Sequence, residues 1–113
     1  MKAPAFGYIQ PKTVDDALEC LQQHGSDATV LAGGQSLLPI MKLDMAAPSD
    51  VISLAGLDEL RGIQRDGDAL VIGAAMTHSE VAGSGEVREA IPALAELAGG
   101  IGDPQVRNRG TLG

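Results

Sequence analysis

Cysteine and aromatic residues are the scarcest side chains in this sequence. The 113 residues include one cysteine, Cys20, and only two aromatic residues, Phe6 and Tyr8. A single thiol excludes an internal disulfide, an iron–sulfur cluster held by this chain and a cysteine-rich zinc site. The shortage of cysteine fits a reducing, cytoplasmic location.

Positive charge is also sparse. Eight Lys and Arg residues stand against 15 Asp and Glu residues, which gives a formal net charge of −7. This balance argues against nucleic-acid binding and against an anionic membrane surface, because both need clustered cations. No apolar run approaches the roughly 20 residues that span a bilayer. The start of the chain lacks the uninterrupted apolar stretch of a signal peptide, so none is expected.

The first half of the sequence predicts a small parallel α/β layer. Hydrophobic residues make up 44% of the chain, as expected of a folded domain, and glycine is frequent at 15 residues. Thr13 and Asp16 stand in capping-box positions before an apolar helical stripe, and Gly25 stands where that helix would end. A strand on either side of this helix makes a βαβ unit. The expected elements are strands over residues 6–9, 28–32 and 51–54 and a helical stretch over residues 37–43.

The second half predicts an antiparallel structure. Asp66-Gly67 between two apolar runs is typical of a β-hairpin. Thr77 and Glu80 predict a capping box that opens a short helix, and a further helix is expected over residues 91–98. The predicted fold class is therefore α/β passing to α+β. A parallel N-terminal subdomain over residues 1–56 is followed, over residues 57–113, by the beginning of a second, antiparallel one.

The main candidate site is the glycine-rich loop Ala32-Gly33-Gly34-Gln35-Ser36, between the second strand and the next helical stretch. Two glycines let the main chain approach a ligand closely, and amides that open a helical turn can donate to an anion. The pattern favours binding of a phosphate or pyrophosphate. The loop is not a P-loop, because no Lys-Ser or Lys-Thr follows, and it lacks the third glycine of the dinucleotide fingerprint. A simple tight turn remains the alternative.

The polar tail is the second candidate. Glycine pairs flank Arg107 and Arg109, which could attract an anionic cofactor or a partner, or lie in a solvated loop. No catalytic triad, carboxylate pair or metal-ligand cluster can be assembled from the remaining side chains. We therefore predict no catalytic residue and no metal site in this chain.

Three motifs, in order along the chain, resemble one family. They are residues 32–37 after the βαβ unit, Gly-Ala-Ala-Met-Thr at 73–77 after the hairpin, and residues 105–113, which end in Gly110-Thr111-Leu112-Gly113. Together they resemble the FAD-binding medium subunit of the molybdenum hydroxylases, the family of xanthine dehydrogenase and carbon monoxide dehydrogenase. The resemblance covers the whole chain and implies an FAD-binding domain of the para-cresol methylhydroxylase type, with FAD between its two subdomains.

The resemblance also implies a set of cofactor-binding residues. Residues 32–37 would hold the FAD pyrophosphate, Thr77, Ile101 and Gly102 would lie along the cofactor, and residues 111–113 would form a second FAD loop. Binding would be noncovalent, because the histidine that attaches FAD in related oxidases is absent beside the first loop. The implied FAD contacts are Ala32, Gly33, Gly34, Gln35, Ser36, Leu37, Thr77, Ile101, Gly102, Thr111, Leu112 and Gly113.

The function implied by the resemblance is electron transfer in an oxidoreductase. FAD would pass electrons from iron–sulfur clusters to an external acceptor, and the partners would be an iron–sulfur small subunit and a molybdopterin large subunit. The molybdenum cofactor and the clusters would belong to those subunits. Two alternatives stay open: a stand-alone FAD-dependent reductase of the same broader fold, and a non-enzymatic α/β module.

One departure from the family pattern leads to a further expectation. The family reads Thr-Leu-Gly-Gly in the second FAD loop and continues, whereas this sequence stops at Gly113. The sequence therefore resembles an N-terminal fragment with an unfinished second subdomain. On this interpretation the fragment alone is inactive and binds FAD weakly, and Leu70 and Ile72 expose apolar surface that further strands would cover.

Overall fold

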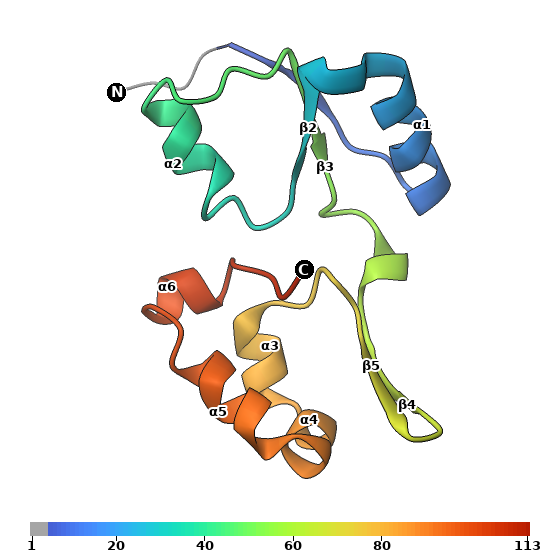
Figure 1. Cartoon of the computed structure of the whole chain (residues 1–113), viewed down its shortest axis with the longest axis vertical. Coiled ribbons are helices and arrows are strands. Elements are labelled where there is room, and N and C mark those ends of the chain that lie inside the picture. Colours follow the sequence, from blue (N-terminus) through green and yellow to red (C-terminus); the bar gives the residue numbers. More distant parts are fainter. Residues whose placement is uncertain (1–4) are drawn as a thin grey trace. The chain divides into compact units, whose positions relative to one another are not determined.

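The structure, a computed structural model, describes residues 5–113, which form two compact units (Figure 1). The first unit ends at Asp58 and the second runs from Glu59 to Gly113, slightly beyond the boundary predicted at residue 56. The expectation about a signal peptide concerns the start of the chain, where residues 1–4 lie outside the described residues. Within the described range, no helix is both long and apolar enough to cross a membrane.

The first unit is built on a three-stranded parallel sheet in the order β1–β3–β2. Strand β3 is last in sequence but central in the sheet, with Val51 opposite Tyr8 on one side and Thr29 on the other. The parallel sheet confirms the prediction for the first half of the sequence. Its elements are β1 (Gly7–Ile9), α1 (Val14–His24), the 3₁₀ turn η1 (Gly25–Asp27), β2 (Ala28–Leu31), α2 (Leu37–Lys42) and β3 (Asp50–Ser53).

The ends of α1 follow from its sequence. The Thr13 side chain accepts a hydrogen bond of 3.0 Å from the Asp16 N–H, as an N-cap does. At the other end, the N–H of Gly25 caps the helix by donating to the Leu21 carbonyl. His24, the last residue of α1, places Nδ1 3.3 Å from Oδ2 of Asp50, so the helix end is tied to the start of β3.

The core of the first unit is formed around β3, the central strand of the sheet. Val51 and Ile52 are almost fully buried, and Met41 of α2 is completely buried. Leu57, which follows β3, adds a fourth large apolar side chain at 1% exposure.

Ile52→Ala should destabilise this unit more than any exposed substitution in the same sheet. Ile52 has no exposed surface, and truncating a buried isoleucine removes apolar burial and leaves a cavity, at a cost of about 2–5 kcal/mol. Denaturant unfolding of the full-length protein measures the change. Val30→Ala is the control, since Val30 lies on neighbouring β2 and is 37% exposed. Equal losses for the two variants would contradict this assignment of the core.

The second unit combines one antiparallel hairpin with short helices. The predicted hairpin is confirmed: Asp66 pairs with Ala69 across the turn, and Gly67 has φ of +61°. Its elements are the 3₁₀ turn η2 (Asp58–Leu60), which begins at the end of the first unit, and β4 (Ile63–Asp66), β5 (Ala69–Ile72), α3 (His78–Gly83), α4 (Gly85–Ala90), α5 (Pro92–Gly99) and α6 (Pro104–Arg107).

Helices α4 and α6 were not expected from the sequence. Each has six or fewer residues, too few for an apolar period to be read. Both begin with a side-chain cap, from Ser84 to the Val87 N–H and from Asp103 to the Val106 N–H. The segment that the sequence shows as a polar tail therefore contains a helical turn.

The hairpin packs one face on the helices, which corrects the expectation about Leu70 and Ile72. Both side chains are half-buried and pack with Ile63 against a cluster of buried helix and loop residues. Val71, which points to the opposite face of the strand, is 45% exposed. Helices of the same unit therefore cover the apolar side chains of the hairpin, which the sequence analysis expected further strands to cover. The buried cluster is Met76, Val81, Val87, Ala95 and Ala98.

Candidate functional site

Loop 32–36 connects the end of β2 to the start of α2 within the first unit. Gly34 has φ of +80°, a conformation that L side chains rarely adopt. A Cβ built on Gly34 would also lie 2.8 Å from Cδ1 of Leu38. The backbone conformation therefore calls for glycine at this position, and the Leu38 side chain would have to move to admit a Cβ.

The amides of this loop are available to a ligand. Within the described part of the chain, the main-chain N–H groups of residues 33–37 donate to no protein oxygen. The next turn is closed normally, with Leu38 donating to the Gly34 carbonyl at 3.2 Å and Ile40 donating to the Ser36 carbonyl at 3.3 Å. Consecutive open amides at a helix start are the donors that phosphates use in other proteins.

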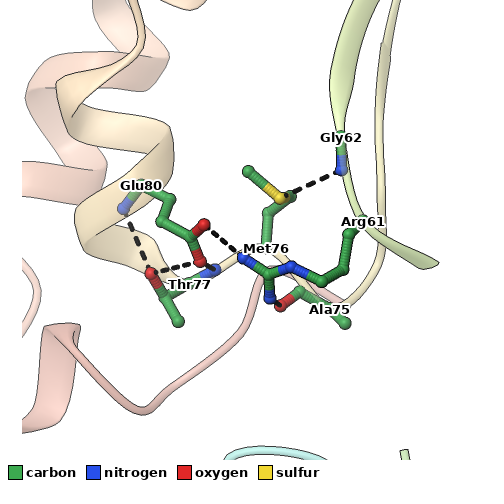
Figure 2. A network of polar contacts seen from close by, with 6 residues as sticks. All are labelled: Arg61, Gly62, Ala75, Met76, Thr77 and Glu80. Atoms are coloured by element: carbon green, nitrogen blue, oxygen red, sulfur yellow. Dashed lines mark hydrogen bonds and ion pairs between the residues drawn. The ribbon is translucent and has the colours of Figure 1, made fainter. Parts of the chain in front are cut away.

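Thr77 begins α3 in the second unit with the predicted capping box. Its hydroxyl accepts from the Glu80 N–H at 3.1 Å, and Oε1 of Glu80 accepts from the Thr77 N–H at 3.1 Å. The Thr77 hydroxyl also donates to the same carboxylate oxygen at 3.0 Å. Thr77 is therefore held rigidly at the start of the helix (Figure 2).

The predicted second FAD loop lies alongside the segment that carries Thr77. Thr77 and Thr111 form an antiparallel bridge. Leu112 donates to the Met76 carbonyl at 2.9 Å, and Gly113 donates to the Ala74 carbonyl at 2.8 Å. The structure therefore brings Thr77 together with residues 111–113, which are far apart in the sequence.

Ile101 and Gly102 lie in a separate loop of the same unit, between α5 and α6. Arg107 holds this loop, because its Nη1 donates to the Ile101 carbonyl at 3.2 Å and to the Gly102 carbonyl at 2.9 Å. Gly102 has φ of +53°. The sequence left open whether Arg107 lies in a solvated loop or attracts an anion. In the structure its side chain is half-buried and donates hydrogen bonds to carbonyls of its own loop.

Arg61 is the residue of this region that the sequence did not indicate. It precedes β4 and forms an ion pair with Oε2 of Glu80, and its Nη1 donates to the Ala75 carbonyl at 3.2 Å (Figure 2). The N–H of neighbouring Gly62 points to Sδ of Met76 at 3.2 Å. No sequence pattern pairs an arginine with a carboxylate 19 residues away, so only the fold reveals this contact.

The charge state of Glu80 depends on these partners. Its partial burial alone would raise the pKa of the carboxyl, but hydrogen bonds from Arg61 and Thr77 and the positive charge of Arg61 outweigh burial and lower the pKa below its usual value. Glu80 is therefore ionised at neutral pH. Among the described residues, no group of three or more His, Cys, Asp and Glu side chains could hold a metal ion.

Glu80 should make part of the stability of the second unit dependent on pH. Because its pKa is lower in the folded than in the unfolded state, its contribution is present above the unfolded-state pKa and is lost as pH falls through the folded-state pKa. Glu80→Gln keeps an oxygen for the cap but cannot ionise. We expect the parent to be more stable than this variant at pH 7, with the difference shrinking towards pH 3 in denaturant unfolding. A difference that is constant with pH would contradict the assignment.

Comparison with known proteins identifies the family. A family model described as the FAD binding domain in molybdopterin dehydrogenase matches residues 4–113. The chain belongs to this family. The resemblance drawn from the three motifs is therefore confirmed, and so is the combination of a parallel and an antiparallel sheet in the predicted fold class.

Relatives and solved structures agree with the family assignment. The carbon monoxide dehydrogenase medium chain of Hydrogenophaga pseudoflava is 50% identical over the full chain, and the nicotine 6-hydroxylase medium subunit of Paenarthrobacter nicotinovorans is 40% identical. The structure of the Hydrogenophaga enzyme superimposes with a TM-score of 0.97, covering 98% of this chain and 39% of that one. The structure of quinoline 2-oxidoreductase from Pseudomonas putida superimposes with a TM-score of 0.96 at 35% identity. The match covers 100% of this chain and 39% of that one.

The chain spans about two fifths of the length of these relatives. The share covered is 39% of the carbon monoxide dehydrogenase medium chain and 40% of the nicotine 6-hydroxylase subunit, with all of this chain included in both cases. Residues 4–113 match the model of the family's FAD-binding domain, and the chain is shorter than either relative.

Proposed function

We propose that the chain binds FAD noncovalently and that loop 32–36, with Leu37, takes the pyrophosphate through main-chain amides. The single observation that carries this assignment is the run of open N–H groups over residues 33–37 beside a glycine at φ of +80°. The positive φ of Gly34 suits the loop to such a group, because glycine adopts this conformation without strain and carries no side chain over the main chain. Neutral amides can hold the pyrophosphate without a lysine or arginine, which suits an acidic chain.

The residues that the resemblance implies in the second unit would also contact FAD. Thr111, Leu112 and Gly113 form the second FAD loop in this proposal, and Thr77 lies beside them at the start of α3. Ile101 and Gly102 contribute from the loop held by Arg107. The support is that Thr77 and residues 111–113, which were selected from separate motifs, are joined by a main-chain bridge.

In the whole protein we propose an electron-transfer role. Bound FAD would supply the redox chemistry, accepting electrons and delivering them to an external acceptor, while the chain binds and orients it. Iron–sulfur clusters and the molybdenum cofactor would belong to partner subunits in the cytoplasm, and the single cysteine within residues 1–113 cannot hold a cluster. The relatives named as medium chains and medium subunits support this division. No side chain here is assigned a catalytic role.

Purification of the full-length protein tests both parts of the proposal. We expect a yellow protein that releases free FAD on denaturation, and co-purification with one subunit rich in iron and sulfur and another containing molybdenum. A colourless protein that binds no added FAD would contradict the cofactor assignment. A fully active single-chain enzyme that reduces its own substrate would contradict the electron-transfer role but not FAD binding.

A further inference from the structure

The turn over residues 73–76 is the support of the proposed second FAD loop. Its carbonyls at Ala74 and Met76 accept the hydrogen bonds from Gly113 and Leu112. The turn is closed by a hydrogen bond of 3.1 Å from the Met76 N–H to the Gly73 carbonyl. The position of residues 111–113 therefore depends on how the peptide groups of this turn are oriented.

Residues 60–62 fix the same turn from another part of the chain. The Gly73 N–H donates to the Gly62 carbonyl at 2.8 Å, and the Ala75 N–H donates to the Leu60 carbonyl at 2.9 Å. Arg61 adds a side-chain contact to the Ala75 carbonyl. The carbonyl that Arg61 holds thus belongs to the residue between the two acceptors of the second FAD loop.

Arg61 also connects this turn to α3. Its guanidinium pairs with one oxygen of Glu80, while the other oxygen accepts from the N–H and hydroxyl of Thr77. One guanidinium therefore reaches both the turn and the helix cap (Figure 2). Its planar arrangement of donors suits two acceptors at fixed positions, which a lysine ammonium matches less well.

The exposure of the pair argues against a role in stability alone. The Arg61 side chain is 41% exposed and the Glu80 side chain is 36% exposed. Isolated ion pairs at such exposure contribute little to folding. The contacts of this pair are instead concentrated on the Thr77 cap and on the turn that holds residues 111–113.

We propose that Arg61 and Glu80 form a positioning pair that sets the orientation of Thr77 and of residues 111–113 towards FAD. Neither side chain is assigned a contact with the cofactor. The inference rests on the proposed function, because it requires that residues 111–113 contact FAD. It names a role for two residues outside the motifs that mark the family's glycine-rich loops.

The test compares FAD binding by variants of the full-length protein, measured by flavin fluorescence titration and by the visible circular dichroism of bound flavin. We expect Arg61→Ala and Glu80→Gln each to weaken FAD binding about tenfold, with no further loss in the double variant, as for two groups acting as one unit. Glu80→Gln keeps an acceptor for the Thr77 cap, so it separates loss of the ion pair from loss of the helix start.

Arg61→Lys and Arg65→Ala are the matched variants. Arg61→Lys keeps the charge but not the planar donors, and we expect its affinity to lie between those of the parent and Arg61→Ala. Arg65→Ala removes an exposed arginine from β4, and we expect parental affinity. The flavin dichroism should change in Arg61→Ala even at saturating FAD, which a purely structural loss of folded protein would not produce.

Failure of the inference and failure of the proposed function give different results. If Gly34→Val abolishes FAD binding while Arg61→Ala and Glu80→Gln retain parental affinity and dichroism, the proposed function stands and the positioning role is overturned. Additive losses in the double variant would also overturn it. If the full-length parent binds no FAD, the proposed function and the positioning role are both overturned.

Discussion

Gly34→Val in the full-length protein should abolish FAD binding, with an affinity loss of about 100-fold or more. The substitution places a β-branched side chain at φ of +80°, where its Cβ would lie 2.8 Å from Cδ1 of Leu38. Side chains at such angles carry strain of about 1–3 kcal/mol. The Leu38 methyl can rotate away from the new side chain, so the backbone strain is the larger effect. Relief of that strain moves the loop, and the amides of residues 33–37 would then no longer face one pyrophosphate.

Gly25→Val is the matched control for this substitution. Gly25 also has positive φ, at +59°, but no atom lies within 4 Å of a Cβ built on it. The two variants therefore share the backbone strain and differ in the loop they change. Flavin fluorescence titration should show lost binding for Gly34→Val and retained binding for Gly25→Val, with similar losses of thermal stability. Parental FAD affinity in Gly34→Val would show that loop 32–36 is a simple turn.

Gly73→Ala should destabilise the second unit by about 3 kcal/mol, at the upper end for an added buried methyl group. A Cβ on Gly73 would lie 2.2 Å from the Leu60 carbonyl oxygen and 2.8 Å from Cα of Arg61. These are main-chain atoms, which cannot rotate away as a side chain can. Residues 60–62 must separate from the turn, so the hydrogen bonds between Gly73 and Gly62 and between Ala75 and Leu60 are weakened as well.

Denaturant unfolding and amide exchange measure this effect. The expected pattern is a lower unfolding midpoint, with faster exchange at Gly73 and Ala75, whose N–H groups face residues 60–62. Gly83→Ala serves as the control, because no atom lies within 4 Å of its Cβ position at the end of α3. That variant should be neutral or slightly stabilising. A parental midpoint for Gly73→Ala would contradict the packing of residues 60–62 on the turn.

Local signals in the sequence were sufficient for the elements with marked ends. Thr13, Thr77 and Gly67 predicted two helix starts and a hairpin turn, and each is found where it was expected. These features depend on hydrogen bonds and dihedral angles within a few residues, so the sequence carries the full information. Helices α4 and α6 were not predicted, because each is too short to show the apolar periodicity of a helix.

The candidate site was predicted in pieces. The motifs selected loop 32–36, Thr77 and residues 111–113. The family match supports this choice of motifs. Contacts between these residues and FAD remain a prediction. The main-chain bridge between Thr77 and Thr111 joins residues far apart in the sequence, and nothing local specifies it. Arg61 could not be selected at all, because its role depends on contacts with Ala75 and Glu80 across a hairpin.

The sequence by itself determined the family, the acidic character and the glycine positions that an anion-binding loop requires. Each of these follows from composition or from motifs read in order. The tertiary structure alone decided that β3 lies in the centre of the parallel sheet, that Leu70 and Ile72 are covered by helices, and that Arg61 supports the turn beneath residues 111–113. Those features arise from pairing between distant segments, whose geometry is fixed only when the apolar faces of both are buried together.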